Sequence, residues 1–210
     1  MKQVKVYIET TKNNLPQSGS SGAAGWDLIA AQDCIILPGQ TKLIDTGIKT
    51  AISAGYEIQI RPRSGISLRT ALRIPNSPGT IDSDYRDEIK VIAHNTFQIT
   101  DLPNLILFNP VIVERLKEFH MVDGLTYFEN NNLNTGLVDL LSEKLKKQLK
   151  KTAVYLDQSG YPFGTIKIKK GERFAQMVVA KYCMPQFEIV RDITSIGTDR
   201  GGGFGSTGKD

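Results

Sequence analysis

The sequence predicts a mainly β protein, an antiparallel sandwich or jelly roll interrupted by a small α-helical insert. Short apolar stretches separated by turn residues recur through the first 96 residues, which is typical of all-β domains. Helical patterns replace them between residues 97 and 162, and strand patterns resume at Thr165. The chain has 210 residues, 40% hydrophobic and 23% charged, so it is long enough to bury a core and suits one domain with an insert.

Alternation of apolar and polar residues marks the expected strands in order. Val4, Val6 and Ile8 begin the first strand, and a loop of small residues then leads to Trp26. Strands are expected at residues 4–8, 26–28, 33–37, 42–48, 56–61 and 88–93, and again at 165–169 and 173–183. Because these strands are short and regularly spaced, they favour antiparallel sheets over βαβ units.

The segment 97–162 carries two helical patterns. Asn109 followed by Pro110 is typical of a helix start, and three apolar residues then fall on one face: Ile112, Leu116 and Phe119. After an Asn-rich loop at 129–134, four leucines share the face of a second helix, with five lysines beside it: Leu137, Leu141, Leu145 and Leu149, then Lys144, Lys146, Lys147, Lys150 and Lys151. This basic helix either faces solvent or binds nucleic acid, an acidic membrane or a protein.

Charge and cysteine usage exclude several classes of protein. The net charge of +4 and a pI near 9.0 are too mild to indicate nucleic-acid binding. Cys34 and Cys183 belong to no CxxC pair or Cys/His cluster, which argues against a disulfide framework or a zinc site. The N-terminus has no apolar signal-peptide core, and no apolar run approaches the length of a membrane span. We therefore expect a cytoplasmic protein.

The most informative stretch is 75–95, where a turn cluster precedes an acidic segment that becomes a strand. If the segment is extended, Asp82 faces opposite to Ile81 and the same way as Asp84. A hairpin with Tyr85 and several carboxylates could hold a flat ligand while Asp82 acts as a general base. The alternative is a solvated acidic turn.

Two further stretches suggest phosphate binding. Arg61, Arg63 and Ser64 precede Gly65, and a hydroxyl, an arginine fork and glycine N–H groups together could cradle a phosphate. The alternative is a basic strand end whose serine caps a helical turn. Gln176 lies in an apolar strand, where a buried amide needs partners, so it is a candidate to point into a site; Arg173 raises the same question.

The glycine-rich C-terminal stretch admits three interpretations. Residues 203–209 satisfy GxxxxGK, but Asp210 stands where a P-loop needs Ser or Thr, which argues against that motif. One RGG-like copy is weak support for RNA contact. A strap over a ligand would use glycine N–H groups, Arg200, Ser206 and Thr207 on phosphates while Phe204 stacks on a base.

Five stretches in order resemble the motifs of the homotrimeric dUTPases: AAGWDL at 23–28, PRSGIS at 62–67, GTIDSDYRDEIKV at 79–91, GERFAQMVV at 171–179 and RGGGFGSTG at 200–208. The resemblance covers the chain apart from 97–162. It implies a jelly-roll-like dUTPase β-barrel core at 1–96 and 163–210, with a C-terminal arm at 198–210. It also implies a threefold trimer with shared active sites, and hydrolysis of dUTP to dUMP and pyrophosphate with Mg²⁺.

The resemblance also implies residue roles. Asp82 would deprotonate a water that attacks the α-phosphate, and Tyr85 would pack under the deoxyribose. The uracil edge would meet the hairpin at Asn76, Gly79 and Ile81. The α- and β-phosphates would meet Arg63, Ser64, Gly65 and Gln176, while the arm would supply Arg200, Phe204, Gly205, Ser206, Thr207 and Gly208. Mg²⁺ would have no direct protein ligand, being held by phosphates and waters with support from Asp27 and Gln176.

Two departures from the family pattern point to alternatives. Trp26 stands where a smaller aromatic residue is usual. We expect the Trp26 side chain to pack in the core. The insert resembles the extra segment of dUTPases from staphylococcal phages, which are linked to binding a repressor of mobile genetic islands. A regulatory protein contact is therefore a second hypothesis. dCTP deaminase shares the fold, but the hairpin and tail match the hydrolase better. The expected partners are dUTP, two further copies of the chain and a repressor protein, with no membrane or nucleic acid.

Overall fold

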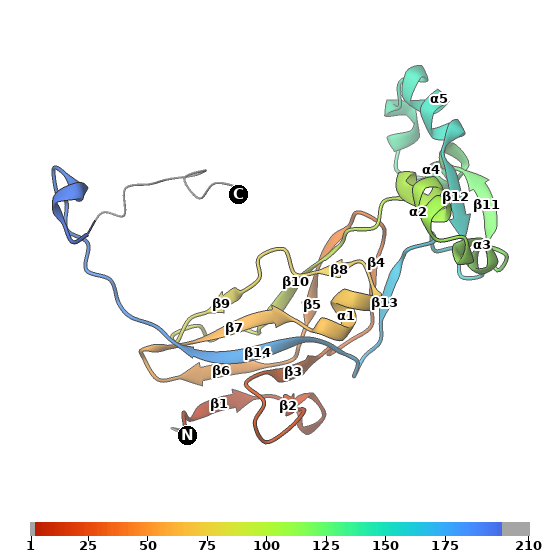
Figure 1. Ribbon diagram of the computed structural model, residues 1–210. Coiled ribbons are helices and arrows are strands. Elements are labelled where there is room, and N and C mark those ends of the chain that lie inside the picture. The colour runs from red at the N-terminus through yellow and green to blue at the C-terminus, as the bar shows by residue number, and fades with distance from the viewer. Residues whose placement is uncertain (1–2, 199–210) are drawn as a thin grey trace.

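Antiparallel strands form the body of the molecule in a computed structural model that describes residues 3–198 (Figure 1). The largest sheet has the order β2-β3-β14-β7-β9, and smaller sheets pair β5-β10-β8, β1-β6 and β13-β4. The strands of the body are β1 Val6–Glu9, β2 Gln17–Ser18, β3 Trp26–Ile29, β4 Cys34–Ile36, β5 Thr41–Asp45, β6 Lys49–Ile52, β7 Tyr56–Pro62, β8 Leu72–Arg73, β9 Gly79–Ile81, β10 Lys90–Asn95, β13 Ile166–Ile168 and β14 Arg173–Lys181.

One hydrophobic core lies between these sheets. Alternate residues face it on the longer strands, as Ile58 and Ile60 do on β7 and Val91 and Ala93 do on β10. Phe174 of β14 is buried in the same cluster. The predicted mainly β fold class is therefore confirmed. Trp26 is 44% exposed, so the expectation that it packs in the core is wrong.

The 97–162 segment projects from one end of this body (Figure 1). Its elements are α2 Leu102–Phe108, α3 Val111–Leu116, β11 His120–Asp123, α4 Gly124–Asn131, α5 Glu143–Lys151 and β12 Ala153–Leu156. The antiparallel pair β11-β12 was not expected from two helical patterns. Asp123 caps α4 by accepting hydrogen bonds from the N–H groups of Leu125 and Thr126, each at 3.0 Å.

Both helical predictions for this segment need correction. Asn109 lies at the C-terminal end of α2, and Pro110 takes the N-cap position of α3, so Asn109 is not its cap. Ile112 and Leu116 do share the apolar side of α3 and pack in one cluster with Phe163. Phe119 joins the same cluster from beyond the end of the helix.

The expected leucine-faced helix from residue 137 to 149 is interrupted. Leu137–Leu140 is a short 3-10 turn, and Leu141 has extended backbone angles. Ser142 then starts α5, its hydroxyl accepting a hydrogen bond from Leu145 N at 3.3 Å. A serine that caps a new helix therefore breaks the periodicity that the four leucines suggested. The Asn-rich region at 129–134 also begins within α4 rather than in a loop.

Buried polar and aromatic groups fasten the two ends of the 97–162 segment to the body. The fully buried Asn95 donates through Nδ2 to the carbonyl oxygens of Ile36, at 3.0 Å, and Gly164, at 2.9 Å, and its Oδ1 accepts from Phe97 N at 3.1 Å. Gly164 has φ +86°, and a Cβ there would lie 2.2 Å from the Phe97 ring. The Phe97 and Phe163 ring centroids are 5.7 Å apart, in an edge-to-face arrangement.

The Asp157 carboxylate holds the turn after β12 together, and its interactions make the stability of the fold depend on pH. Its carboxylate accepts from Ser159 N at 2.9 Å, Tyr161 N at 3.0 Å and Lys167 Nζ at 2.6 Å. Burial raises the pKa of Asp157, but the Lys167 hydrogen bond and the two backbone donors outweigh it, so the pKa lies below the ordinary 3.8. A lowered folded-state pKa adds stability that is complete above the unfolded value and is lost as the pH falls below it.

Asp157→Asn should therefore flatten the decline in unfolding free energy as the pH falls through and below 3.8. Urea unfolding at a series of pH values measures this slope. Asp139→Asn, at an exposed position, is the charge-matched control. Identical slopes for the wild type and Asp157→Asn would contradict the prediction.

No helix in the part of the chain from residue 3 to 198 is long and apolar enough to cross a bilayer.

Candidate active site

A network of charged groups joins three elements at one end of the main sheet. Asp27 lies on β3, Arg63 follows β7, and Arg173 begins β14. Arg63 Nε donates to Asp27 Oδ1 at 2.7 Å and its Nη2 donates to Asp27 Oδ2 at 3.0 Å, which is the bidentate geometry of a strong pair. Arg63 Nη1 also donates to the Arg173 carbonyl at 3.2 Å. Two of the five guanidinium N–H groups of Arg63 remain for a ligand.

Arg173 completes this network from the other side. Its Nη1 lies 3.4 Å from Asp27 Oδ2, and its side chain is half exposed. Asp27 therefore holds one arginine by two hydrogen bonds and a second arginine at longer range. Because both guanidinium groups stay partly open to solvent, the end of the sheet presents positive charge in a fixed orientation.

Gln176 and Ser64 lie beside the network. Gln176 is the register partner of Asp27 across the β14-β3 ladder, and its Nε2 donates to the Pro62 carbonyl at 2.9 Å. Its Oε1 lies 2.3 Å from the place where a Cβ on Gly25 would stand, so a side chain at residue 25 would displace the Gln176 amide. We expected the Gln176 amide to need a hydrogen-bond partner, and the Pro62 carbonyl is that partner.

Ser64 is the exposed first residue of α1 Ser64–Arg69, and Gly65 follows it. Arg63 occupies the N-cap position, and the cap makes no side-chain hydrogen bond. The alternative in which the serine caps the helical turn is therefore wrong. The Ser64 side chain is left exposed at the helix start, and Ser64 directly follows Arg63 in the chain.

The acidic hairpin differs from the extended segment that the sequence suggested. β9 ends at Ile81, and Tyr85 N donates to the Asp82 carbonyl at 3.2 Å, so residues 82–85 form a turn. The argument that Asp82 and Asp84 share one face of a strand is thus wrong, because alternation holds only in extended chain. Asp82 and Asp84 are exposed, and the Tyr85 hydroxyl donates to the Glu88 carbonyl at 3.1 Å.

Asn76 and Gly79 lie at the start of this hairpin. The Asn76 Nδ2 is 3.2 Å from the position of a Cβ on Gly79, with Ile60 at 3.5 Å on the other side. A side chain at residue 79 would therefore displace the Asn76 amide. Ile81, half-buried at the end of β9, pairs with Ile58 of β7.

Strand register separates the two halves of the site within one chain. β9 runs antiparallel to β7 with Ile81 opposite Ile58, so Asp82 emerges level with Glu57. Arg63 lies six residues further along, a distance of about 20 Å at about 3.3 Å per residue. In Figure 1, β9 and α1 lie toward opposite ends of β7. One chain therefore brings Arg63, Ser64, Gln176 and Asp27 together, and keeps Asp82 and Tyr85 apart from them.

A polar cavity of about 210 Å³ adjoins Asp27 and Arg173. Asn13, Gln17 and Gly171 contribute to its lining. The sequence offered no signal for Asn13 and Gln17, which come from a short 3-10 helix, Lys12–Asn14, and from the two-residue strand β2. The arm residues Arg200, Phe204, Gly205, Ser206, Thr207 and Gly208 lie outside the described residues.

An antiparallel β body that carries an oriented pair of arginines at one end and a carboxylate hairpin at the other defines a class: β proteins with sites suited to phosphorylated ligands. A family model described as dUTPase matches residues 11–129, more than half of the chain. The deoxyuridine 5'-triphosphate nucleotidohydrolase of Rickettsia felis is 33% identical over 98% of this chain and 97% of its own length. The chain belongs to the dUTPase family, and the resemblance seen in its motifs is confirmed.

Other similarities differ in extent. The nucleotidohydrolase of Chlamydia pneumoniae is 55% identical over 83 residues, so the match spans 39% of this chain and only 57% of that relative. The solved structure of Staphylococcus bacteriophage 80alpha dUTPase with dUpNHpp covers 98% of this chain and 99% of its own, at a TM-score of 0.64 and 22% identity. At that identity the structural match establishes a shared fold.

Proposed function

We propose that this protein hydrolyses dUTP to dUMP and pyrophosphate. The observation that carries the proposal is the Asp27-Arg63 pair beside Ser64 and Gln176, in a chain of the dUTPase family. The remaining N–H groups of Arg63, the Ser64 hydroxyl and the N–H of Gly65 are donors for the α- and β-phosphates. Asp27 accepts from Arg63 and acts on the phosphates only through that arginine.

In this proposal Asp82 is the general base. Its carboxylate takes a proton from a water whose oxygen attacks the α-phosphorus, and the bond from that phosphorus to the bridging oxygen breaks to release pyrophosphate. Tyr85 supports the deoxyribose, while Asn76 and the backbone at Gly79 and Ile81 pair with the uracil edge. Cytosine would leave those polar groups unpaired, which gives a physical basis for selectivity.

The proposed active site is composite, in a trimer of this chain. Two features support it: the distance of about 20 Å between Arg63 and Asp82 within one chain, and the apolar side chains on the stretch after β14. Phe187 is 90% exposed there, and Met184, Ile189 and Ile193 are also exposed. Such side chains gain free energy by packing on another chain. The arm at 198–210 would then complete a neighbour's site, with Arg200, Ser206 and Thr207 on the phosphates and Phe204 on uracil.

The donor set fits a magnesium ion carried by the substrate. Between residues 3 and 198, no group of three or more His, Cys, Asp or Glu side chains is placed to hold a metal. Mg²⁺ favours phosphate oxygens and waters over an all-protein cage, so Asp27 and Gln176 would support its water shell. When bound, Mg²⁺ neutralises charge on the triphosphate.

Product analysis by ion-exchange chromatography tests the activity. With Mg²⁺, dUTP should yield equal amounts of dUMP and pyrophosphate while dCTP remains intact. Release of ammonia from dCTP would instead assign the protein to the deaminases of the same fold. Unchanged dUTP would overturn the proposal.

Exposed apolar side chains of the 97–162 segment support a second function, binding of a repressor protein. Phe108 is 84% and Leu140 is 78% exposed, and the lysines of α5 lie in the same segment. A study of the 80alpha enzyme states that phage dUTPases control transfer of virulence genes. The domain division proposed from the sequence, a core at 1–96 and 163–210 with an insert at 97–162, would place this contact away from the Arg63 network.

A pull-down with a purified phage-island repressor tests this second function. Phe108→Ser combined with Leu140→Ser should abolish capture and keep dUTP turnover. Deletion of 97–162 should do the same, because Asn95 Nδ2 and the Gly164 carbonyl are only 2.9 Å apart and a short linker can join the cut ends. If the protein lacking residues 97–162 captured the repressor as well as the wild type, the segment would not be the binding site.

A further inference from the structure

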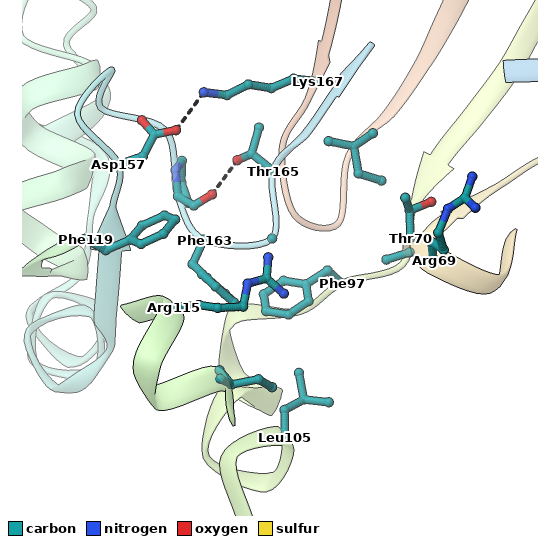
Figure 2. A pocket seen from close by; sticks show the side chains of 15 residues that line it. Arg69, Thr70, Phe97, Leu105, Arg115, Phe119, Asp157, Phe163, Thr165 and Lys167 are labelled. Carbon is teal, nitrogen blue, oxygen red and sulfur yellow. Dashed lines mark hydrogen bonds and ion pairs between the residues drawn. The ribbon is translucent and has the colours of Figure 1, made fainter. Parts of the chain in front are cut away.

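A cavity of about 380 Å³ lies where the 97–162 segment meets the body (Figure 2). Its volume falls within the range of small-ligand pockets, about 300–1,000 Å³. It is separate from the Arg63 network and from the Asp82 hairpin, neither of which contributes to its lining. No role proposed above uses this space.

The cavity combines an apolar wall with cationic groups. Phe97, Phe119 and Phe163 supply the aromatic part of the wall, and Leu105 and Ile112 extend it. The rings are held rigidly, since Phe163 packs edge-on against Phe97 and against Phe119, the latter at 5.2 Å between centroids. A wall of this kind removes an apolar body of matching size from water.

Two arginines contribute to the lining from different elements. Arg115, from α3, lies over the Phe163 ring at 5.2 Å, and Arg69 comes from the end of α1. In Figure 2, Phe97 stands between them. Within residues 3–198, neither guanidinium is paired with a carboxylate, whereas the nearby Lys167 is paired with Asp157. The Arg69 guanidinium is turned toward the start of α1, since its Nη2 lies 3.3 Å from the position of a Cβ on Gly65. Of the charges around the cavity, Arg115 is therefore the one available to a ligand.

We propose that this cavity binds a small organic anion that joins a carboxylate or phosphate to an aromatic or branched aliphatic body. The anionic group meets Arg115 through charge-assisted hydrogen bonds. The apolar body lies against Phe97 and Phe163. Both features are needed, because either an anion alone or a neutral ring alone satisfies only part of the lining.

Isothermal titration of the full chain with benzoate tests the proposal, with benzamide as a neutral probe of the same shape and inorganic phosphate as an anion without an apolar body. Benzoate should bind once per chain, at least tenfold more tightly than either comparison probe. Equal binding of benzamide or phosphate, or no binding of benzoate up to solubility, would overturn the proposal.

Variants locate the binding event. Arg115→Gln should weaken benzoate binding at least tenfold, because a hydrogen bond to a charged group is lost. Lys117→Gln removes an exposed positive charge one position after α3, outside the cavity, and should leave affinity unchanged. Leu105→Trp, at a partly exposed position, should fill apolar space and also weaken binding. Wild-type affinity in Arg115→Gln would place benzoate elsewhere. Circular dichroism and dUTP turnover, measured on each variant, show that the fold is intact.

Discussion

Asp82→Asn is expected to lower kcat for dUTP by about 10²- to 10⁴-fold, the usual contribution of a general base. Asparagine keeps the shape of the side chain but cannot accept the proton from the attacking water. Asp82 is exposed in a turn and lies outside the Arg63 network, so dUTP affinity should change little. Single-turnover kinetics with saturating protein measures the chemical step, and equilibrium titration with a non-hydrolysable analogue measures affinity.

Asp84→Asn is the matched control, because Asp84 is exposed in the same turn and also carries one carboxylate. It should retain most of the wild-type kcat. A near-normal kcat in Asp82→Asn would rule out the base assignment. Equal losses in both variants would instead indicate that the charge of the turn matters more than one carboxylate.

Asn95→Ala is expected to lower the unfolding free energy by about 2–5 kcal/mol, a range set by the loss of several buried hydrogen bonds. The Asn95 amide serves two carbonyl groups and one N–H, and alanine would leave all three buried without these partners. The loss should also loosen the 97–162 segment, since Gly164 and Phe97 are two of the partners. Urea unfolding followed by circular dichroism, at one fixed chain concentration, measures the change.

Asn131→Ala provides the comparison within the same chain. The Asn131 side chain is exposed on α4 and donates to the Tyr127 carbonyl at 2.8 Å, where water replaces the bond easily. Its unfolding free energy should stay within about 0.5 kcal/mol of the wild type. If Asn95→Ala proved as mild as Asn131→Ala, the buried network would not fasten the segment.

Periodicity predicted the longer elements because they obey one local rule. The alternation at 56–61 and 173–183 places Ile58, Ile60 and Met177 in the core, as observed. The antiparallel pair β11-β12 escaped prediction because its strands, 32 residues apart at Val122 and Val154, lack a local turn signal. The leucine spacing from 137 to 149 predicted one continuous helix, which is wrong because Ser142 caps a new helix within that range.

The sequence suggested which residue types form the candidate site, and that assignment stays a prediction; it did not suggest how these residues are connected. Arg63, Ser64 and Gln176 were expected near phosphate, and the structure brings them together at one end of the sheet. Asp27 forms an ion pair with Arg63 and also contacts Arg173. These contacts depend on the pairing of β3 with β14, which residue spacing does not reveal. Asn95 gave no signal either, because an asparagine in a strand reads as polar and therefore as exposed.

The sequence by itself determined the mainly β class, the order of the five motifs and, through them, the family, because these depend on residue identity and short-range alternation. Only the tertiary structure decided that Arg63 and Asp82 lie toward opposite ends of β7, and that an aromatic cavity with Arg115 in its wall forms at the junction with residues 97–162. Both depend on strand register and on contacts between residues far apart in the chain, and local preferences do not encode these.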